Sequence, residues 1–245
     1  MTAHLLVIGG QRCGTTYLRA LLDAHPEIAM ARPARPEPKF FCSPDACDLG
    51  LEEYHRRWFA HRTTERVLGD KSTSYLEDPQ APGRAAEMLG EPEVVVLLRD
   101  PVRRAVSHWR FSTANGFETL GLEEALLADL REDRPWDRQS SSVSPFAYLR
   151  RGRYAEQLEP WSTTFPSTTH VLFTEELLAD PAVLTGLVAD LGLDPGRTPV
   201  PDDERVNATP GVAPVLDAGV TSTLEGYFEE SNARLADQLG RPLPW

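Results

Sequence analysis

The stretch Leu5–Thr16, LLVIGGQRCGTT, decides the fold class of this chain. Its four leading apolar residues predict a buried strand, and two glycines follow as a tight turn. A short polar loop then reaches Gly14-Thr15-Thr16, which opens a helix. Backbone amides at such a helix start point outward, and the helix dipole favours an anion there. The stretch therefore predicts a phosphate-binding loop between a strand and a helix.

The spacing of Gly9 and Gly14 is that of a P-loop, with one departure. Where a nucleotide triphosphatase carries lysine, this chain carries Thr15. The only positive charge of the loop is Arg12, inside it. Such a loop can hold a phosphate, but it lacks the lysine that grips a β/γ-phosphate pair. The expected ligand is a phosphorylated nucleotide other than ATP used in the ordinary way.

The pattern along the chain alternates between strands and helices, which predicts an α/β fold with a parallel sheet. We expect a single three-layer domain over residues 1–245, with a central parallel sheet flanked by helices, in the manner of the P-loop NTPases. The expected strands are residues 5–9, 67–69, 94–98 and 170–173, and the expected helices are residues 15–24, 51–61, 79–89, 101–114, 122–131, 148–161, 181–191 and 220–239.

Composition and charge narrow the function classes. The 245 residues carry a net charge of −12. This argues against a general nucleic-acid binder, which shows a basic stripe. No apolar run approaches the length of a membrane span, and the first strand begins too early for a signal peptide. The cysteines Cys13, Cys42 and Cys47 lack a convincing metal spacing, so free thiols are expected. We therefore expect a cytoplasmic protein without a metal, a nucleic-acid partner or a membrane partner.

A second candidate phosphate site lies in residues 94–107, VVVLLRDPVRRAVS. Arg99 follows a buried strand, where doubly wound folds place ligands, and Asp100 is expected to cap a helix that begins at Pro101. Ser107 lies two turns along that helix. The arginine fork and the hydroxyl suit a phosphate, but pairing with a local acid is equally open on position alone. Two such sites indicate a nucleotide with separated phosphates.

Five motifs in order resemble the sulfotransferases that use 3′-phosphoadenosine-5′-phosphosulfate (PAPS). GGQRCGTTYL, residues 9–18, looks like their 5′-phosphosulfate loop, and LLRDPVRRAVSHW, residues 97–109, looks like their 3′-phosphate motif. Glu37–Phe41, Asp70–Tyr75 and Arg151–Tyr154 resemble segments of the glycan-type branch, such as the heparan sulfate sulfotransferases. The resemblance covers nearly the whole chain, and the five motifs together are specific.

This resemblance implies in-line transfer of a sulfuryl group from PAPS to a hydroxyl or amine of a sugar or small-molecule metabolite, without a metal. Glu37 would be the general base, and its apolar neighbours would partly desolvate it. Lys71 would contact the sulfonate or the bridging oxygen, although pairing with Asp70 is its plain structural alternative. Arg12 stands where the family commonly has lysine and would stabilise charge.

The resemblance also implies two sets of binding residues. The set expected to bind the nucleotide is Gln11, Arg12, Cys13, Gly14, Thr15, Thr16, Arg99 and Ser107. The set expected to bind a small-molecule or glycan acceptor is Lys39, Phe40, Phe41, Ser72 and Ser74.

Two other functions stay open at this point. A small-molecule kinase would use a P-loop, but Thr15 in the place of lysine speaks against it. A nucleotide-binding module without catalysis would keep its function when Glu37 or Lys71 is replaced.

Overall fold

The computed structural model describes residues 3–137, 143–198 and 214–245. The chain divides into two compact units: residues 1–98 with 157–207, and residues 99–156 with 208–245. The first unit holds a five-stranded parallel sheet flanked by helices, which confirms the predicted α/β fold class. The expectation of one domain over the whole chain stays a prediction.

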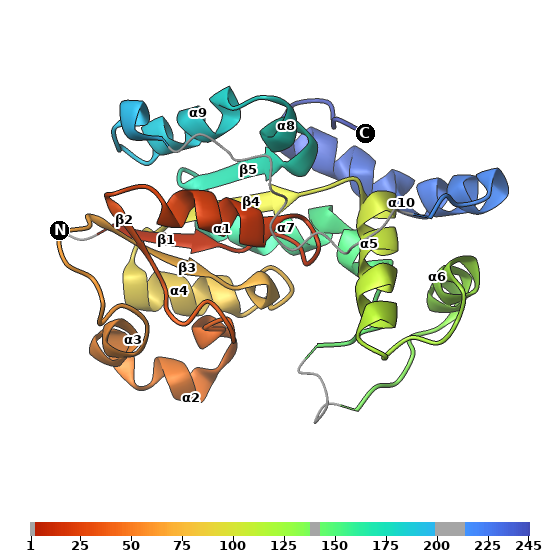
Figure 1. Cartoon of the computed structure of the whole chain (residues 1–245), viewed down its shortest axis with the longest axis horizontal. Coiled ribbons are helices and arrows are strands. Elements are labelled where there is room, and N and C mark those ends of the chain that lie inside the picture. The colour runs from red at the N-terminus through yellow and green to blue at the C-terminus, as the bar shows by residue number, and fades with distance from the viewer. Residues whose placement is uncertain (1–2, 138–142, 199–213) are drawn as a thin grey trace. The chain divides into compact units, whose positions relative to one another are not determined.

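The sheet of the first unit has the strand order β2-β3-β1-β4-β5, with all neighbours parallel (Figure 1). β1 is therefore a central strand, and the loop that follows it leaves the middle of the sheet. The strands are β1 (Ala3–Val7), β2 (Ile28–Met30), β3 (Val67–Lys71), β4 (Glu93–Leu98) and β5 (Thr169–Phe173).

Helices cover both faces of this sheet because its crossovers run in opposite directions. The connection from β1 to β2 passes over β3, and the connection from β3 to β4 passes over β1 the other way. Right-handed crossovers then place α1 (Thr15–Asp23) on one face and α4 (Ala81–Leu89) on the other. α9 (Ala182–Asp190) shares the face of α1, since Leu18 and Leu187 belong to one buried cluster.

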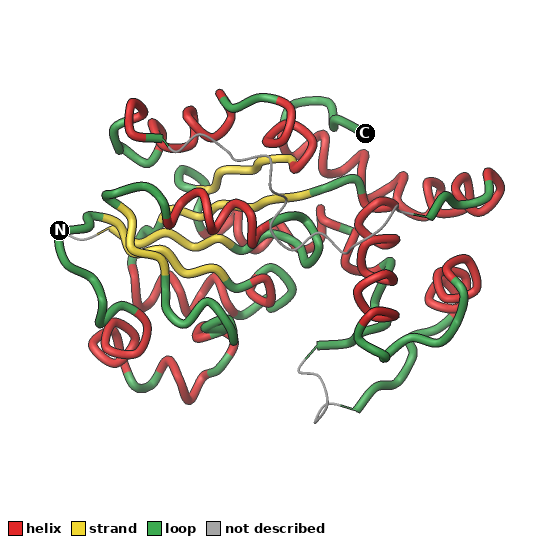
Figure 2. Tube along the Cα trace, viewed as in Figure 1, coloured by secondary structure: helices red, strands yellow, loops and turns green. Residues whose placement is uncertain are grey.

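Short elements complete the first unit. Figure 2 shows loop between β2 and the first turn of 3₁₀ helix, as the proline-rich sequence there predicts. The remaining helices of this unit are α2 (Pro44–Cys47), α3 (Gly50–Trp58), α8 (Thr174–Ala179) and the later part of α7 (Tyr154–Thr164), and its 3₁₀ turns are Phe40–Cys42, Thr73–Tyr75 and Pro195–Arg197.

The second unit is helical. The carboxylate of Asp100 accepts hydrogen bonds from the amides of Val102 (2.8 Å) and Arg103 (3.1 Å), which confirms the predicted cap and the helix start at Pro101. Its helices are α5 (Pro101–Ala114), α6 (Leu122–Arg131), the start of α7 and α10 (Ala218–Leu239), with a 3₁₀ turn at Arg150–Gly152. No helix in the described part of either unit is long and apolar enough to cross a membrane.

The expected helix over residues 148–161 is wrong at its start. Tyr148 is buried and donates a hydrogen bond to Glu118 (2.8 Å), and α7 begins only at Tyr154. Gly152 explains the delay, because a Cβ there would lie 2.7 Å from the ring of Phe228. The backbone at Gly152 packs closely against Phe228 of α10, and the regular helix starts after this contact.

Candidate active site

Gly9 lets the chain leave β1 directly beside β4. A Cβ at this position would lie 2.4 Å from the carbonyl oxygen of Leu97 and 2.5 Å from its amide nitrogen. Gly10 then donates its amide to the same carbonyl at 3.1 Å. The tight turn expected at Gly9 is thus a close approach, since Gly9 lacks a positive φ whereas Arg12 and Gly14 have one. The strand also ends earlier than expected, at Val7.

The loop after Gly10 presents backbone donors at the start of α1. Arg12 and Gly14 have left-handed φ values of 69° and 84°, and Gly14 is the N-cap of α1. Because Gly14 has no side chain, the first amides of α1 receive no side-chain cap. The hydroxyl of Thr174 lies 2.6 Å from the carbonyl oxygen of Cys13 and 2.9 Å from that of Leu98. This holds the loop against the end of β4.

The residues expected to bind the nucleotide in this loop differ in exposure. Cys13 and Thr15 are buried, and contact of the loop residues with a nucleotide stays a prediction. Gln11, Arg12 and Thr16 are half-buried. All three cysteines are free thiols, as expected.

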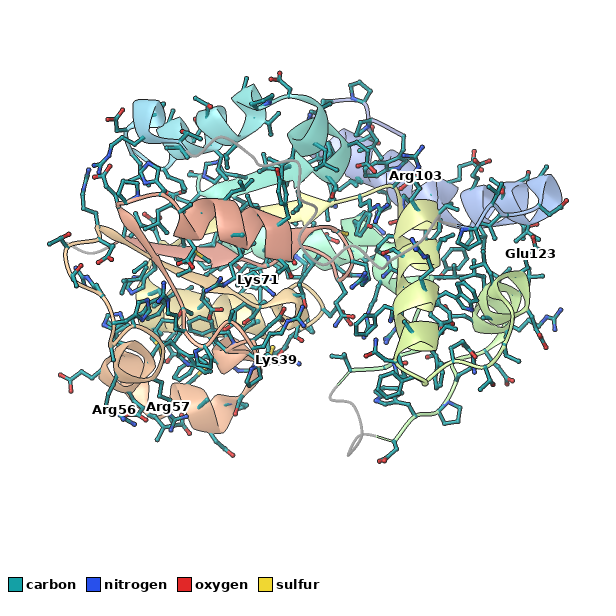
Figure 3. The ribbon with its side chains drawn as sticks, viewed as in Figure 1. Lys39, Arg56, Arg57, Lys71, Arg103 and Glu123 are labelled. Atoms are coloured by element: carbon teal, nitrogen blue, oxygen red, sulfur yellow. The ribbon has the colours of Figure 1, made fainter. Side chains whose placement is uncertain are left out.

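Lys71 and Glu37 form an ion pair at the carboxyl ends of the strands, where the loop after β1 leaves the sheet. Lys71 ends β3 and lies opposite Val7, the last residue of β1. Its ammonium, on a side chain only 5% exposed, donates to Oε1 of Glu37. The alternative pairing of Lys71 with Asp70 is therefore wrong. Figure 3 shows Lys71 at the sheet and Lys39 on the neighbouring loop.

The carboxylate of Glu37 is oriented from its other side by Thr73. The amide and hydroxyl of Thr73 donate to Oε2 at 2.9 and 3.0 Å. A carboxylate has about four lone-pair sites. The bond from Lys71 and the two bonds from Thr73 use three of them. The side chain of Glu37 is 18% exposed. A fixed, half-buried carboxylate with a remaining acceptor site can take a proton from a bound hydroxyl.

Asp70, the residue before Lys71 in β3, is fully buried. Its carboxylate accepts hydrogen bonds from the hydroxyls of Tyr75 (2.6 Å), Ser72 (2.9 Å) and Tyr54 (3.2 Å). Burial raises the pKa of Asp70 to about 6, against the lowering effect of the three hydroxyl donors. Burial likewise raises the pKa values of both tyrosines well above their usual range. The cluster is a satisfied polar network inside the first unit.

Three of the expected acceptor-binding residues have side chains that face inward. Phe40 and Phe41 are 2% and 0% exposed and pack against the ring of Tyr54. Ser72 is 0% exposed, and its hydroxyl is already bonded to Asp70 and to the amide of Lys39. These three side chains pack inside the first unit, and their contact with an acceptor stays a prediction.

Lys39 and Ser74 are more exposed than these three residues. Both are half-buried, and Lys39 has a left-handed φ of 49°. The hydroxyl of Ser74 is buried and has no hydrogen-bond partner among the described residues. A buried hydroxyl without a partner is costly, so a bound polar group would stabilise it. Contact of Lys39 and Ser74 with an acceptor stays a prediction.

Arg99 and Ser107 belong to the second unit. Arg99 directly precedes the cap of α5, and its carbonyl accepts a hydrogen bond from the hydroxyl of Tyr154 at 2.8 Å. Ser107 lies within α5, and both residues are half-buried. Their assignment to a phosphate stays a prediction.

Sequence reasoning missed the residues that orient the others. Thr73 and Tyr75 lie inside the Asp70–Tyr75 motif, where a run of four successive hydroxyl side chains is the available signal. Thr174 comes 161 residues after its partner Cys13, and its sequence context carries no signal. Contacts between distant segments require the fold.

Comparison with known proteins gives one family. The family model described as "Sulfotransferase domain" matches residues 2–190. Heparan sulfate glucosamine 3-O-sulfotransferase 6 of Mus musculus is 34% identical over 98% of this chain and 72% of its own length. Heparan sulfate glucosamine 3-O-sulfotransferase 3B1 of Homo sapiens is 32% identical over 77% of this chain, which spans only 45% of that protein.

A solved structure has the same fold. The sulfotransferase from Alicyclobacillus acidocaldarius superposes with a TM-score of 0.78, covering 99% of this chain and 98% of that one. Its sequence identity is 24%, so the likeness concerns the fold.

Proposed function

Because the chain belongs to the sulfotransferase family, we propose that this enzyme transfers a sulfuryl group from PAPS to a hydroxyl of a sugar, with Glu37 as general base. The observation that supports the proposal most directly is the Lys71–Glu37 pair at the end of β3, beside the glycine loop (residues 8–14) that follows β1. A cation and a carboxylate there lie at the edge of the sheet where the donor is expected.

The glycine loop fits the 5′-phosphosulfate of such a donor. Arg12 supplies a charge, and the uncapped amides at the start of α1 supply backbone donors. The donor brings an activated sulfuryl group and a stable leaving phosphate. The protein would hold that group in line with the acceptor oxygen, as enzymes do in phosphoryl transfer.

In the proposed reaction Glu37 takes the proton of the acceptor hydroxyl while the acceptor oxygen attacks sulfur. Thr73 keeps the carboxylate directed, since its two bonds occupy one oxygen. Lys71 and Arg12 stabilise the negative charge that develops on the sulfonate and the leaving oxygen. The bond that forms joins sulfur to the acceptor oxygen, and the bond that breaks joins sulfur to the phosphate oxygen.

A sugar hydroxyl is the acceptor class that the relatives favour, because their names describe 3-O-sulfotransferases of glucosamine in heparan sulfate. The net charge of −12 weighs against a long polyanion and favours a short saccharide. An amine or the hydroxyl of a small-molecule metabolite is the other acceptor that this chemistry allows.

Nucleotide selectivity tests the proposal. Adenosine 3′,5′-bisphosphate, the desulfated product, should stabilise the protein by about 2.7 kcal/mol at a hundred times its Kd. For a chain of this size that raises Tm by roughly 5–10 °C in a thermal-shift measurement. ATP with Mg²⁺ should shift Tm much less, with Mg²⁺ alone as the control. A larger shift with ATP–Mg²⁺ would favour the kinase.

Arg99→Ala separates the two phosphates. Loss of a charge-assisted hydrogen bond should weaken adenosine 3′,5′-bisphosphate about 10–100-fold and leave adenosine 5′-phosphate unchanged, as measured by calorimetry. Arg103→Ala, which changes an exposed arginine in the first turn of α5, is the matched control and should affect neither ligand. Equal weakening of both nucleotides by Arg99→Ala would remove Arg99 from the 3′-phosphate site.

A further inference from the structure

Asp70 takes no part in the proposed chemistry, yet its buried carboxylate is the centre of a hydrogen-bond network. We propose that Asp70 is a positioning residue that acts through Tyr75 and Ser72 to hold the Glu37 loop in its active position. The Glu37 loop is residues 37–41. This inference rests on the proposed role of Glu37.

Two short chains of hydrogen bonds connect Asp70 to the backbone of that loop. The hydroxyl of Tyr75 donates to Asp70 at 2.6 Å and accepts the amide of Phe40 at 2.9 Å. The hydroxyl of Ser72 donates to Asp70 at 2.9 Å and accepts the amide of Lys39 at 2.9 Å. The loop that carries Glu37 is thus tied to the carboxylate at two successive amides.

The direction of these bonds depends on the carboxylate. A hydroxyl has a single proton, and an ionised carboxylate can only accept. With Asp70 as the acceptor, the protons of Tyr75 and Ser72 point inward, and their lone pairs face the amides of Lys39 and Phe40. In Asp70→Asn the side-chain amide would present a donor to one of these hydroxyls and disturb the direction of the hydrogen bonds.

The Glu37 loop needs such support because secondary structure contributes little to it. Residues 31–39 form neither helix nor strand, and Lys39 has a left-handed φ of 49°. A small displacement would separate the Glu37 carboxylate from the acceptor oxygen, and misplacement by about 1 Å can cost about 100-fold in rate.

Two tyrosines give a matched test. Tyr54 and Tyr75 are both 0% exposed, and both donate to Oδ2 of Asp70. The Tyr75 hydroxyl also accepts the amide of Phe40, and that bond is the difference to be tested. Tyr75→Phe therefore removes a tie to the loop, whereas Tyr54→Phe removes a donor of similar burial.

Transfer from PAPS to a heparan sulfate oligosaccharide should separate the variants. We expect Tyr75→Phe to lower kcat about tenfold or more, with KM for PAPS and the Kd of adenosine 3′,5′-bisphosphate within about twofold. Tyr54→Phe should stay within about twofold of the wild type in kcat. Hydrogen exchange should show faster exchange of the Lys39 and Phe40 amides in Tyr75→Phe but not in Tyr54→Phe. Asp70→Asn should reproduce both effects.

Equal kcat values and equal exchange rates in the two tyrosine variants would overturn the inference. A wild-type chain that binds adenosine 3′,5′-bisphosphate but transfers nothing would instead overturn the proposed function. In that case amide exchange decides alone. Unchanged protection of Lys39 and Phe40 in Tyr75→Phe would then reject the positioning role, and lost protection would support it.

Discussion

Glu37→Gln should lower sulfuryl transfer by about 10²–10⁴-fold, the range that general acid–base catalysis contributes. The Kd of adenosine 3′,5′-bisphosphate should change less than about twofold, because Glu37 does not belong to the glycine loop. Glutamine has nearly the same shape and can still accept the bonds from Thr73, but it cannot take a proton from the acceptor. Initial rates and calorimetry on the same preparation measure the two quantities.

Glu52→Gln, an exposed carboxylate on α3, is the control for a change of charge alone and should leave both quantities unchanged. The melting temperature of Glu37→Gln should also be compared with the wild type, since Lys71 loses its charged partner. Loss of nucleotide binding in step with activity would contradict the assignment of Glu37 as base.

Gly9→Ala should have the largest effect on stability. The added Cβ meets the backbone of Leu97 at 2.4–2.5 Å, and backbone within a central strand cannot move aside as a side chain can. Overpacking of this kind costs about 3 kcal/mol, the upper end of its usual range, which corresponds to a fall in Tm of roughly 6–12 °C. Nucleotide binding should fall with it, because the loop shifts away from β4.

Gly186→Ala in α9 provides the opposite case. No atom lies within 4 Å of a Cβ built there, so the variant should gain about 0.5–1 kcal/mol from helix propensity. Chemical denaturation of both variants measures the difference. If Gly9→Ala proved as stable as Gly186→Ala, the close approach between Gly9 and Leu97 would be absent in solution.

Much of the fold could be predicted because its signals are local. The apolar run at Leu5–Ile8 and the glycines after it locate the first strand and the loop, and Asp100-Pro101 locates the start of α5. β2 was missed because Ile28–Met30 is only three residues long, too short for a periodic pattern. Its assignment as a strand depends on pairing with β3.

The candidate site was harder to predict because its contacts join distant segments. Glu37 and Lys71 are 34 residues apart, and only the fold shows that they pair with each other. Phe40 and Phe41 resemble an acceptor surface in the sequence, but an aromatic cluster with Tyr54 buries them. A motif in the sequence indicates which residues belong to the candidate site. It does not show which of their side chains are buried in the folded chain.

The position of β1 in the middle of the sheet has a consequence for biosynthesis. Its two neighbours, β3 and β4, leave the ribosome after it, so β1 has no partner strand while it is being made. The glycine loop is completed later still. The amide of Gly10 bonds to the carbonyl of Leu97, and the carbonyl of Cys13 bonds to the hydroxyl of Thr174. This segment, translated before its partners, is thus among the last of the first unit to reach its final form, and nascent chains ending before Thr174 lack the contact that holds the glycine loop against β4.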